Sequence, residues 1–397
     1  MLGALTIIPA TLATPEVWLP VNLSCKQEDL ARGLSMVGRA VAVRSTLPVT
    51  SNILLEAGEG RLKLAATNLD IAITSWVDAH IRDNGAITIP ARLLSEFVNS
   101  LPRETIDLKL NDRTRALNAR CRNFEANLKG IDAEEFPPIP SVGPESPITV
   151  SSEALRLAIE LVAFAAATDD SRPVLAGVSM TFEEDRLTLA AADGFRLAVH
   201  SLPLPSTVPT RLSIIVPARA LSELGRVLGS DDDDVTINVT PNRSQILFRL
   251  LNVQLVSRLI EGNFPNYNQI IPKAHSTRVI VGRDEFLEAT KIASYFARDA
   301  ANIVKLEATP AENGAPGRLK VHASAAEVGD TEGEIDVVVE GDAAHIAFNA
   351  KYLSDVLGVV KAPKVIIDVT TPSSPGVLRP EGSEAYTHVI MPMHVAR

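Results

Sequence analysis

One eight-residue pattern recurs three times along this chain, at steps of about 130 residues. It reads IPARLLSE from Ile89, VPARALSE from Val216 and, more weakly, FNAKYLSD from Phe348. A second pattern, LKLAAT from Leu62 and LTLAAA from Leu187, keeps the same order and nearly the same step, with LKVHAS in the third copy. A period of this length matches a whole domain and is too long for a solenoid unit. The sequence therefore predicts three tandem copies of one domain.

Proline-rich segments separate the three copies. Phe136–Pro140 ends the first copy, and Phe264–Tyr267 ends the second. Residues 1–17 carry no Lys or Arg ahead of their apolar run, which argues against a secretory signal and favours an extension outside the first copy. The expected organisation is an N-terminal extension over 1–17 followed by domains over 18–143, 144–273 and 274–397.

Each copy has the same order of expected elements: a helix, short strands, a second helix and further strands. Apolar residues at three- and four-residue spacing predict first helices over Lys26–Val41, Ser152–Ala166 and Arg283–Ala297. Pro90 and Pro217 stand where a second helix begins, because the first turn of a helix tolerates a missing N–H group. The expected fold class is α+β, with two helices packed on antiparallel sheets in each domain. Such sheets can continue from one domain to the next, which protects strand edges.

Composition excludes several classes of function. The net charge of −10 and the isoelectric point near 5.3 disfavour a conventional nucleic-acid binder, so any contact with nucleic acid must use a local basic surface. Cys25 and Cys121 both lie in the first copy, which excludes a disulfide framework repeated in each domain. The chain shows no metal-ligand spacing, phosphate-binding loop or nucleophile motif. We therefore expect no metal, no cofactor and no catalytic activity.

Four segments, in register with the repeat, resemble one family. They are SRPVLAG from Ser171, ADGFRLAV from Ala192, LIEGNFPNY from Leu259 and VIMPM from Val389. Over about residues 18–397 the chain resembles the bacterial sliding clamp, the beta subunit of DNA polymerase III. The resemblance implies a cytoplasmic, nucleoid-associated homodimer that closes head to tail into a ring around duplex DNA, with the helices lining the hole. It implies as partners the DNA polymerase III catalytic subunit, the clamp loader and other proteins with clamp-binding motifs.

The resemblance also implies three sets of functional residues. The DNA-facing set consists of basic residues on or next to the helices: Arg32, Arg39, Arg44, Arg156, Arg172, Arg219, Lys291, Arg298 and Lys351. The partner-peptide pocket consists of Leu175, Gly194, Arg196, Leu197, Pro265, Ile270, Asn349, Tyr352, Val389, Ile390, Met391, Pro392 and Met393. The dimer interface consists of Phe124 and Ala126 against Tyr295 and Phe296. Leu, Ile, Val and Met side chains suit an adaptable groove for apolar peptide anchors, and Gly194 permits close backbone approach.

One alternative remains open from the sequence. Phe195 stands where the family often has His, so a clamp-like scaffold that binds peptides without encircling DNA is the competing hypothesis. Retention on nicked circular DNA that is lost on linearisation would distinguish the two. The residues named for the pocket have their own competing interpretation, in which they only complete the core of the third domain.

Overall fold

The computed structural model describes residues 21–42, 44, 46–140, 147–169, 171–229, 234–312 and 315–394. The expected extension over 1–17 and the expected boundary near residue 143 lie outside these residues. The chain divides into two compact units, one containing the first repeat and the other containing the second and third repeats. None of the helices within the described ranges is long and apolar enough to span a membrane.

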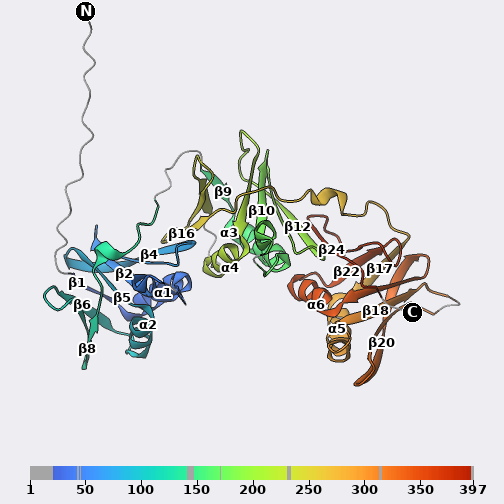
Figure 1. Cartoon of the computed structure of the whole chain (residues 1–397), viewed down its shortest axis with the longest axis horizontal. Helices are drawn as coiled ribbons and strands as arrows, with labels where there is room; N and C mark the ends of the chain where they lie inside the picture. Colours follow the sequence, from blue (N-terminus) through green and yellow to red (C-terminus); the bar gives the residue numbers. More distant parts are fainter. Residues whose placement is uncertain are drawn as a thin grey trace, which may run out of the picture. The chain divides into compact units, whose positions relative to one another are not determined.

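The first repeat contains two α-helices and eight strands among its described residues (Figure 1). The helices are α1 (Gln27–Val37) and α2 (Ala91–Ser100). The strands are β1 (Asn22–Lys26), β2 (Asn52–Gly58), β3 (Arg61–Thr67), β4 (Ile71–Asp83), β5 (Gly85–Pro90), β6 (Thr105–Asn111), β7 (Ala116–Cys121) and β8 (Phe124–Lys129). Strand β4 joins the two halves of this repeat, because it pairs with β3 along its first part and with β1 along its last part. The series β1, β6, β7 and β8 ends at β8.

The second and third repeats follow the same order of elements. The helices are α3 (Ser152–Val162), α4 (Ala218–Val227), α5 (Arg283–Ala297) and α6 (Ala350–Val359). The strands of the second repeat are β9 (Ile148–Val150), β10 (Gly177–Glu183), β11 (Arg186–Ala192), β12 (Arg196–Pro203), β13 (Leu212–Pro217), β14 (Val235–Val239), β15 (Gln245–Arg249) and β16 (Val253–Arg258). Those of the third are β17 (Thr277–Gly282), β18 (Ile303–Thr309), β19 (Gly317–Ala325), β20 (Gly329–Gly341), β21 (Ala344–Asn349), β22 (Lys364–Val369), β23 (Gly376–Pro380) and β24 (Tyr386–Ile390). The predicted order of helix, strands, helix and strands is confirmed, except that one strand, β1, β9 or β17, precedes the first helix of each repeat.

The helices form where apolar residues recur at helical spacing. Leu155, Ile159 and Val162 of α3 are all buried, and a buried Leu side chain contributes about 1.5–3 kcal/mol to folding. Helix α5 has the predicted bounds, whereas α1 ends at Val37 and gives way to a 3₁₀ turn over Gly38–Ala40. Pro90 and Pro217 stand at the N-cap, one residue before the first turn in which the sequence placed them.

A continuous antiparallel sheet crosses from the second repeat to the third. Strand β12 pairs with β24 in the register Arg196↔Ile390 to His200↔Tyr386. The sheet thereby runs from β13 through β10, β11, β12, β24, β23, β22 and β17 to β20. Helices α3 and α4 pack together, as do α5 and α6 (Figure 1). The expectation that sheets continue from domain to domain is confirmed at this junction.

Candidate functional site

A buried arginine links the second repeat to a helix of the third. The Arg196 side chain at the start of β12 is only 6% exposed. Its Nη1 donates to Asp355 Oδ2 at 2.6 Å, its Nε donates to Asp193 Oδ2 at 3.0 Å, and its Nη2 donates to the carbonyl oxygen of Phe164 at 2.8 Å. The guanidinium carbon lies 4.6 Å from the ring centroid of Tyr352, which shares α6 with Asp355. A charge this buried is stabilised by the two carboxylates and the aromatic face around it.

The segment after β24 is held on both sides by backbone hydrogen bonds. The Met391 N–H donates to the Phe195 carbonyl at 2.8 Å, and the Met393 N–H donates to the Ala347 carbonyl at 2.8 Å. Phe195 precedes β12 in the second repeat, and Ala347 lies in β21 of the third. Met391 is 39% exposed, so this segment presents an apolar side chain to solvent.

Two groups of apolar side chains lie around this segment, one buried and one exposed to solvent. Leu197, Val377 and Val389 form a buried cluster, against which Tyr267 and Ile271 pack. Within two residues of these floor positions along the chain, three large apolar side chains, called here the rim, remain open to solvent: Phe195 (58% exposed), Ile270 (44%) and Met391. An exposed apolar rim over a rigid apolar floor is the arrangement expected of a groove that receives the side chains of a linear peptide.

Some of the residues assigned to the pocket contact one another, and others are buried below its surface. Arg196 contacts Tyr352, Leu197 packs with Val389, and Asn349 caps α6 by accepting from the Lys351 N–H. The side chains of Val389 and Ile390 are at most 1% exposed. Val389 belongs to the floor cluster, whereas Ile390, the next residue of the strand, points to the opposite face of the sheet.

The remaining pocket candidates lie at the edges of this region. Pro392 and Met393 are half-buried. Leu175 lies in the 3₁₀ turn Pro173–Ala176. Pro265 lines a cavity of about 820 Å³ beside β10 and β13, together with Tyr267.

Arg172 lies beside the pocket and not on a helix. Gly194 has φ of +96°, and a Cβ atom there would come within 2.7 Å of Arg172 Nη1. The Arg172 guanidinium therefore lies against the backbone of a residue assigned to the pocket. Arg172 also lies 3.7 Å from Asp169 Oδ2, and its side chain is 46% exposed, so its assignment to the DNA-facing set stays a prediction.

The other DNA-facing candidates follow the helices. Arg32, Arg156, Arg219, Lys291 and Lys351 lie on α1, α3, α4, α5 and α6, and Arg39, Arg44 and Arg298 lie just after a helix. All of these but Arg39 and Arg156 are exposed. Three of them have partners on the same or the adjoining helix: Lys351 Nζ lies 2.7 Å from Asp355 Oδ2, Arg32 Nη1 lies 3.7 Å from Asp29 Oδ1, and Arg298 stacks on Tyr295 at 5.2 Å.

The interface candidates lie on two separate surfaces. On β8, Phe124 is 56% exposed and Ala126 is half-buried. On α5, Tyr295 is 62% exposed, Phe296 is half-buried, and the neighbouring Ile292 is 47% exposed. An open groove between α5 and β20 has Ile292 in its wall and an acidic rim that includes Glu285, Glu288, Glu332, Glu334 and Asp336.

Sequence reasoning missed several residues that build the pocket. Asp355 carries a helical signal, since it follows Tyr352 by three residues and so lies on the same face of α6. Phe164 and Tyr267 have no such signal, because they reach the site through a 3₁₀ turn and a linker. Among the described residues, no three His, Cys, Asp or Glu side chains lie close enough together to hold a metal ion.

Beneath the pocket, His388 of β24 is fully buried between aromatic rings. Its ring centroid lies 5.6 Å from that of Phe164 and 6.3 Å from that of Tyr386. Burial, together with the nearby positive charge of Arg196, lowers the pKa of His388 from 6.5 to about 3. His388 is therefore neutral in the folded protein throughout the physiological range.

We expect the substitution His388→Gln to reduce the loss of stability in mild acid. Unfolded His388 takes up a proton below about pH 6.5 while the folded residue resists it, so stability falls as the pH drops from 6.5 toward 3. At pH 5 this one group accounts for about 2 kcal/mol of the loss. Urea unfolding of both proteins at pH 7 and pH 5 measures the difference, and equal losses would contradict the prediction.

The pocket beside the β12–β24 junction is called the seam pocket below. Together with the repeated domain and the continuous sheet, it defines a clamp-domain protein. Sequence comparison agrees: the chain matches the N-terminal, central and C-terminal domains of the DNA polymerase III beta subunit over residues 21–140, 149–266 and 268–394. The chain therefore belongs to the DNA polymerase III beta subunit family, the bacterial sliding clamps. Members of this family are non-catalytic processivity factors of DNA replication, with DNA and polymerases as partners.

Individual relatives agree over nearly the whole chain. The beta sliding clamp of Synechococcus elongatus is 32% identical, and the match covers 94% of this chain and 100% of the relative. The sliding clamp structure from Bacillus subtilis is 29% identical with a TM-score of 0.88, covering 95% of this chain and 100% of that one. A Pseudomonas aeruginosa sliding clamp bound to griselimycin has 28% identity and a TM-score of 0.87, covering 94% and 100%.

Proposed function

We propose that two copies of this chain close head to tail into a ring around duplex DNA. The observation that carries the proposal is the junction between β12 and β24. In the order of elements, β8 is the first-repeat counterpart of β24, and β20 is the third-repeat counterpart of β12. Among the residues that the structure describes, β8 pairs only with β7, and residues 329–337 of β20 pair only with β19. Each of these strands therefore has one edge without a partner strand. A second copy supplies the missing partner to each, and two such junctions complete six domains.

Charge supports the same junction. The side of β20 and α5 is acidic, with Glu332, Glu334 and Asp336 on the strand. Strands β7 and β8 carry two basic residues, Arg120 and Lys129, against one acidic residue, Glu125. Opposite charges on two surfaces that must meet favour the head-to-tail arrangement and disfavour contact between two identical ends.

In this proposal the ring holds DNA by enclosure. Neutralising each phosphate adds salt-dependent affinity, so a protein that must slide is served by few and weak contacts. A chain of net charge −10 with basic residues on its helices fits that requirement. The same ring would carry the polymerase III catalytic subunit, the clamp loader and other clamp-binding proteins at the seam pocket, in the cytoplasm at the nucleoid. We keep the basic residues named above, Arg172 included, as the DNA-facing set.

Topology-dependent retention tests the proposal directly. The protein, loaded with its clamp loader onto nicked circular DNA, should stay bound through gel filtration and be lost when the DNA is linearised. A peptide-binding scaffold would bind clamp-binding peptides and show no difference between circular and linear DNA. Equal retention on both forms would therefore reject enclosure.

We expect the double substitution Arg219→Glu and Lys291→Glu to shorten residence on circular DNA about threefold at 0.15 M salt, because phosphate contacts are lost. These exposed residues lie on α4 and α5, two helices that carry none of the residues assigned to the pocket. The control is Arg186→Glu with Arg249→Glu, which makes the same charge change on exposed strand positions. Residence shortened equally by both pairs would contradict a DNA-facing role for the helices.

A further inference from the structure

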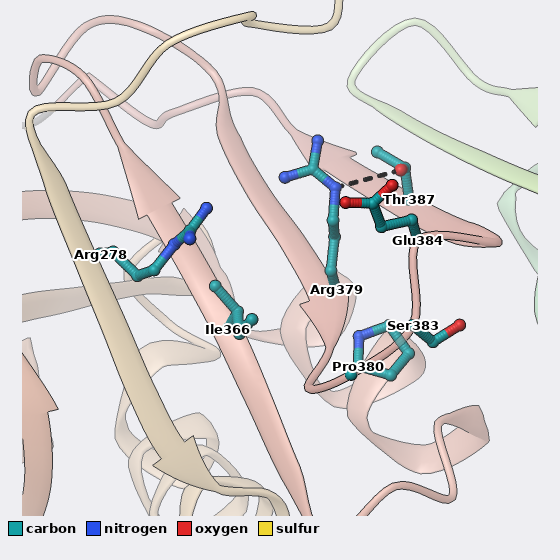
Figure 2. A pocket seen from close by; sticks show the side chains of 8 residues that line it. Arg278, Ile366, Arg379, Pro380, Ser383, Glu384 and Thr387 are labelled. Carbon is teal, nitrogen blue, oxygen red and sulfur yellow. Dashed lines mark hydrogen bonds between the residues drawn. The ribbon is translucent and has the colours of Figure 1, made fainter.

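Another cavity opens on the sheet of the third repeat, outside the residues assigned to the pocket. It has a volume of about 650 Å³ and is lined by residues of β17, β22, β23 and β24 and of the turn that joins the last two strands. Figure 2 shows Arg278 and Arg379 on opposite sides, with Ile366 between them. The apolar floor and the two guanidinium groups give this cavity a defined chemistry.

A buried carboxylate fixes both guanidinium groups. The Asp368 side chain is 6% exposed. It accepts from Arg278 Nε at 2.7 Å and Nη2 at 3.1 Å, and from Arg379 Nη1 at 2.9 Å. The Nε of Arg379 donates to Thr387 Oγ1 at 3.3 Å (Figure 2). Two long side chains are thus held in place before any ligand arrives, which lowers the entropic cost of binding.

The cavity has an excess of hydrogen-bond donors. Each guanidinium carries five N–H groups, and Asp368 with the Thr387 hydroxyl cannot accept them all. Glu340, opposite Arg278 on β20, adds a nearby negative charge. Within the described part of the chain, neither Arg278 Nη1 nor Arg379 Nη2 has a hydrogen-bond partner. The side chains are 31% and 26% exposed, so these atoms remain accessible. A ligand with two acceptor oxygens in one plane would match such donors.

The cavity lies directly beside the floor of the seam pocket. Alternate residues of a strand point to the same face, so Arg379 shares a face with Val377 on β23, and Thr387 shares it with Val389 on β24. Val377 and Val389 are paired neighbours in the register and belong to the buried floor cluster. A step of two residues along a strand is about 7 Å. An extended peptide anchored in the pocket can therefore reach the cavity within about two to four residues.

We propose that this cavity binds the carboxylate of an acidic side chain that flanks the apolar anchors of a partner peptide. The inference rests on the proposed peptide pocket and adds an electrostatic subsite to it. Glu384, at the rim, directs its own carboxylate toward Arg379 (Figure 2). It competes with the ligand for the same donors, so partners with an acidic flank are selected by displacing it.

Calorimetry with paired peptides tests the proposal. The probes are neutral peptides with Leu and Phe anchors, in which a single Asp is moved through four positions on either side, each compared with an Asn twin. At the position that reaches the cavity, Asp should bind about fivefold more tightly than Asn. In the Arg379→Gln protein, the Asp peptide and its Asn twin should bind equally tightly. The affinity of the Asn twins should not fall, because Arg278 still donates to Asp368. The substitution Glu384→Gln should increase the ratio of Asp-peptide to Asn-peptide affinity, because it removes the competing carboxylate.

The control and the outcomes separate this inference from the proposed function. Arg186→Gln makes the same charge change as Arg379→Gln at an exposed position of β11 and should leave the ratio unchanged. Binding of the Asn twins without any advantage for Asp, or an advantage that survives Arg379→Gln, overturns the subsite alone. If no peptide binds, the pocket and the subsite both fail. Loss of DNA retention in Arg379→Gln with the peptide ratio intact would mean a site for nucleic-acid phosphate and would also overturn the proposal.

Discussion

A chain that stops at Ile390 is expected to bind partner peptides at least 30-fold more weakly, with its fold and native mass unchanged. The truncation removes the exposed Met391 side chain and the two hydrogen bonds that hold the segment between Phe195 and Ala347. Central apolar contacts of this kind contribute about 2–4 kcal/mol each to binding. The buried Val389 and Ile390 remain, so the core is preserved.

Calorimetry with a clamp-binding peptide measures the effect of this truncation. The matched control is a chain that ends at His394, which keeps the whole rim segment and should bind normally. Circular dichroism and native mass establish that both truncated chains are folded. An affinity within threefold of the full-length protein would show that residues 391–393 do not form a wall of the pocket.

The substitution Phe124→Asp is expected to convert the two-chain particle into single chains and to abolish retention on circular DNA. Phe124 opens the end strand β8 and is 56% exposed, so the change removes apolar area that only a partner could bury. It would also bury a carboxylate without a partner at an acidic surface, at a cost of several kcal/mol. We expect the dimer dissociation constant to rise by at least about 100-fold.

Light scattering gives the native mass, and the retention assay gives the topological consequence. Phe195→Asp is a matched control, because Phe195 is equally exposed (58%) but lies at the pocket rim. It should reduce peptide affinity and leave the mass unchanged. A Phe124→Asp protein that keeps the mass of two chains would reject β8 as the subunit junction.

The sequence predicted the repeated architecture because periodic patterns are local. Buried residues such as Leu155 and Ile159 recur at helical spacing, and the three first helices were placed to within a few residues. Their exact ends could not be predicted, since the step from α1 into a 3₁₀ turn at Gly38 depends on packing against the sheet. The general capacity of sheets to continue from domain to domain was expected, but its register was not, because Arg196↔Ile390 joins residues far apart in the chain.

The pocket was harder to predict than the fold because burial and pairing are properties of the assembled structure. Family resemblance named Val389 and Ile390, but nothing in the sequence says that their side chains face the core. Arg172 was grouped with the DNA-facing residues because it follows a helix, and nothing in the sequence shows that its guanidinium lies against Gly194. The Arg278–Asp368–Arg379 group has no signal in the sequence, since each member comes from a different strand.

The hydrogen-bonded seam between β12 and β24 has a consequence for how a ring of this kind could open. Both walls of the peptide pocket belong to one covalent chain, and five residue pairs of continuous sheet join them. A break at the subunit junction, where β8 meets a second copy, would leave those pairs intact. A clamp loader could then bind the peptide pocket while it opens the ring at the subunit junction. Each closed ring would have two peptide pockets, and opening the junction would not disrupt either of them.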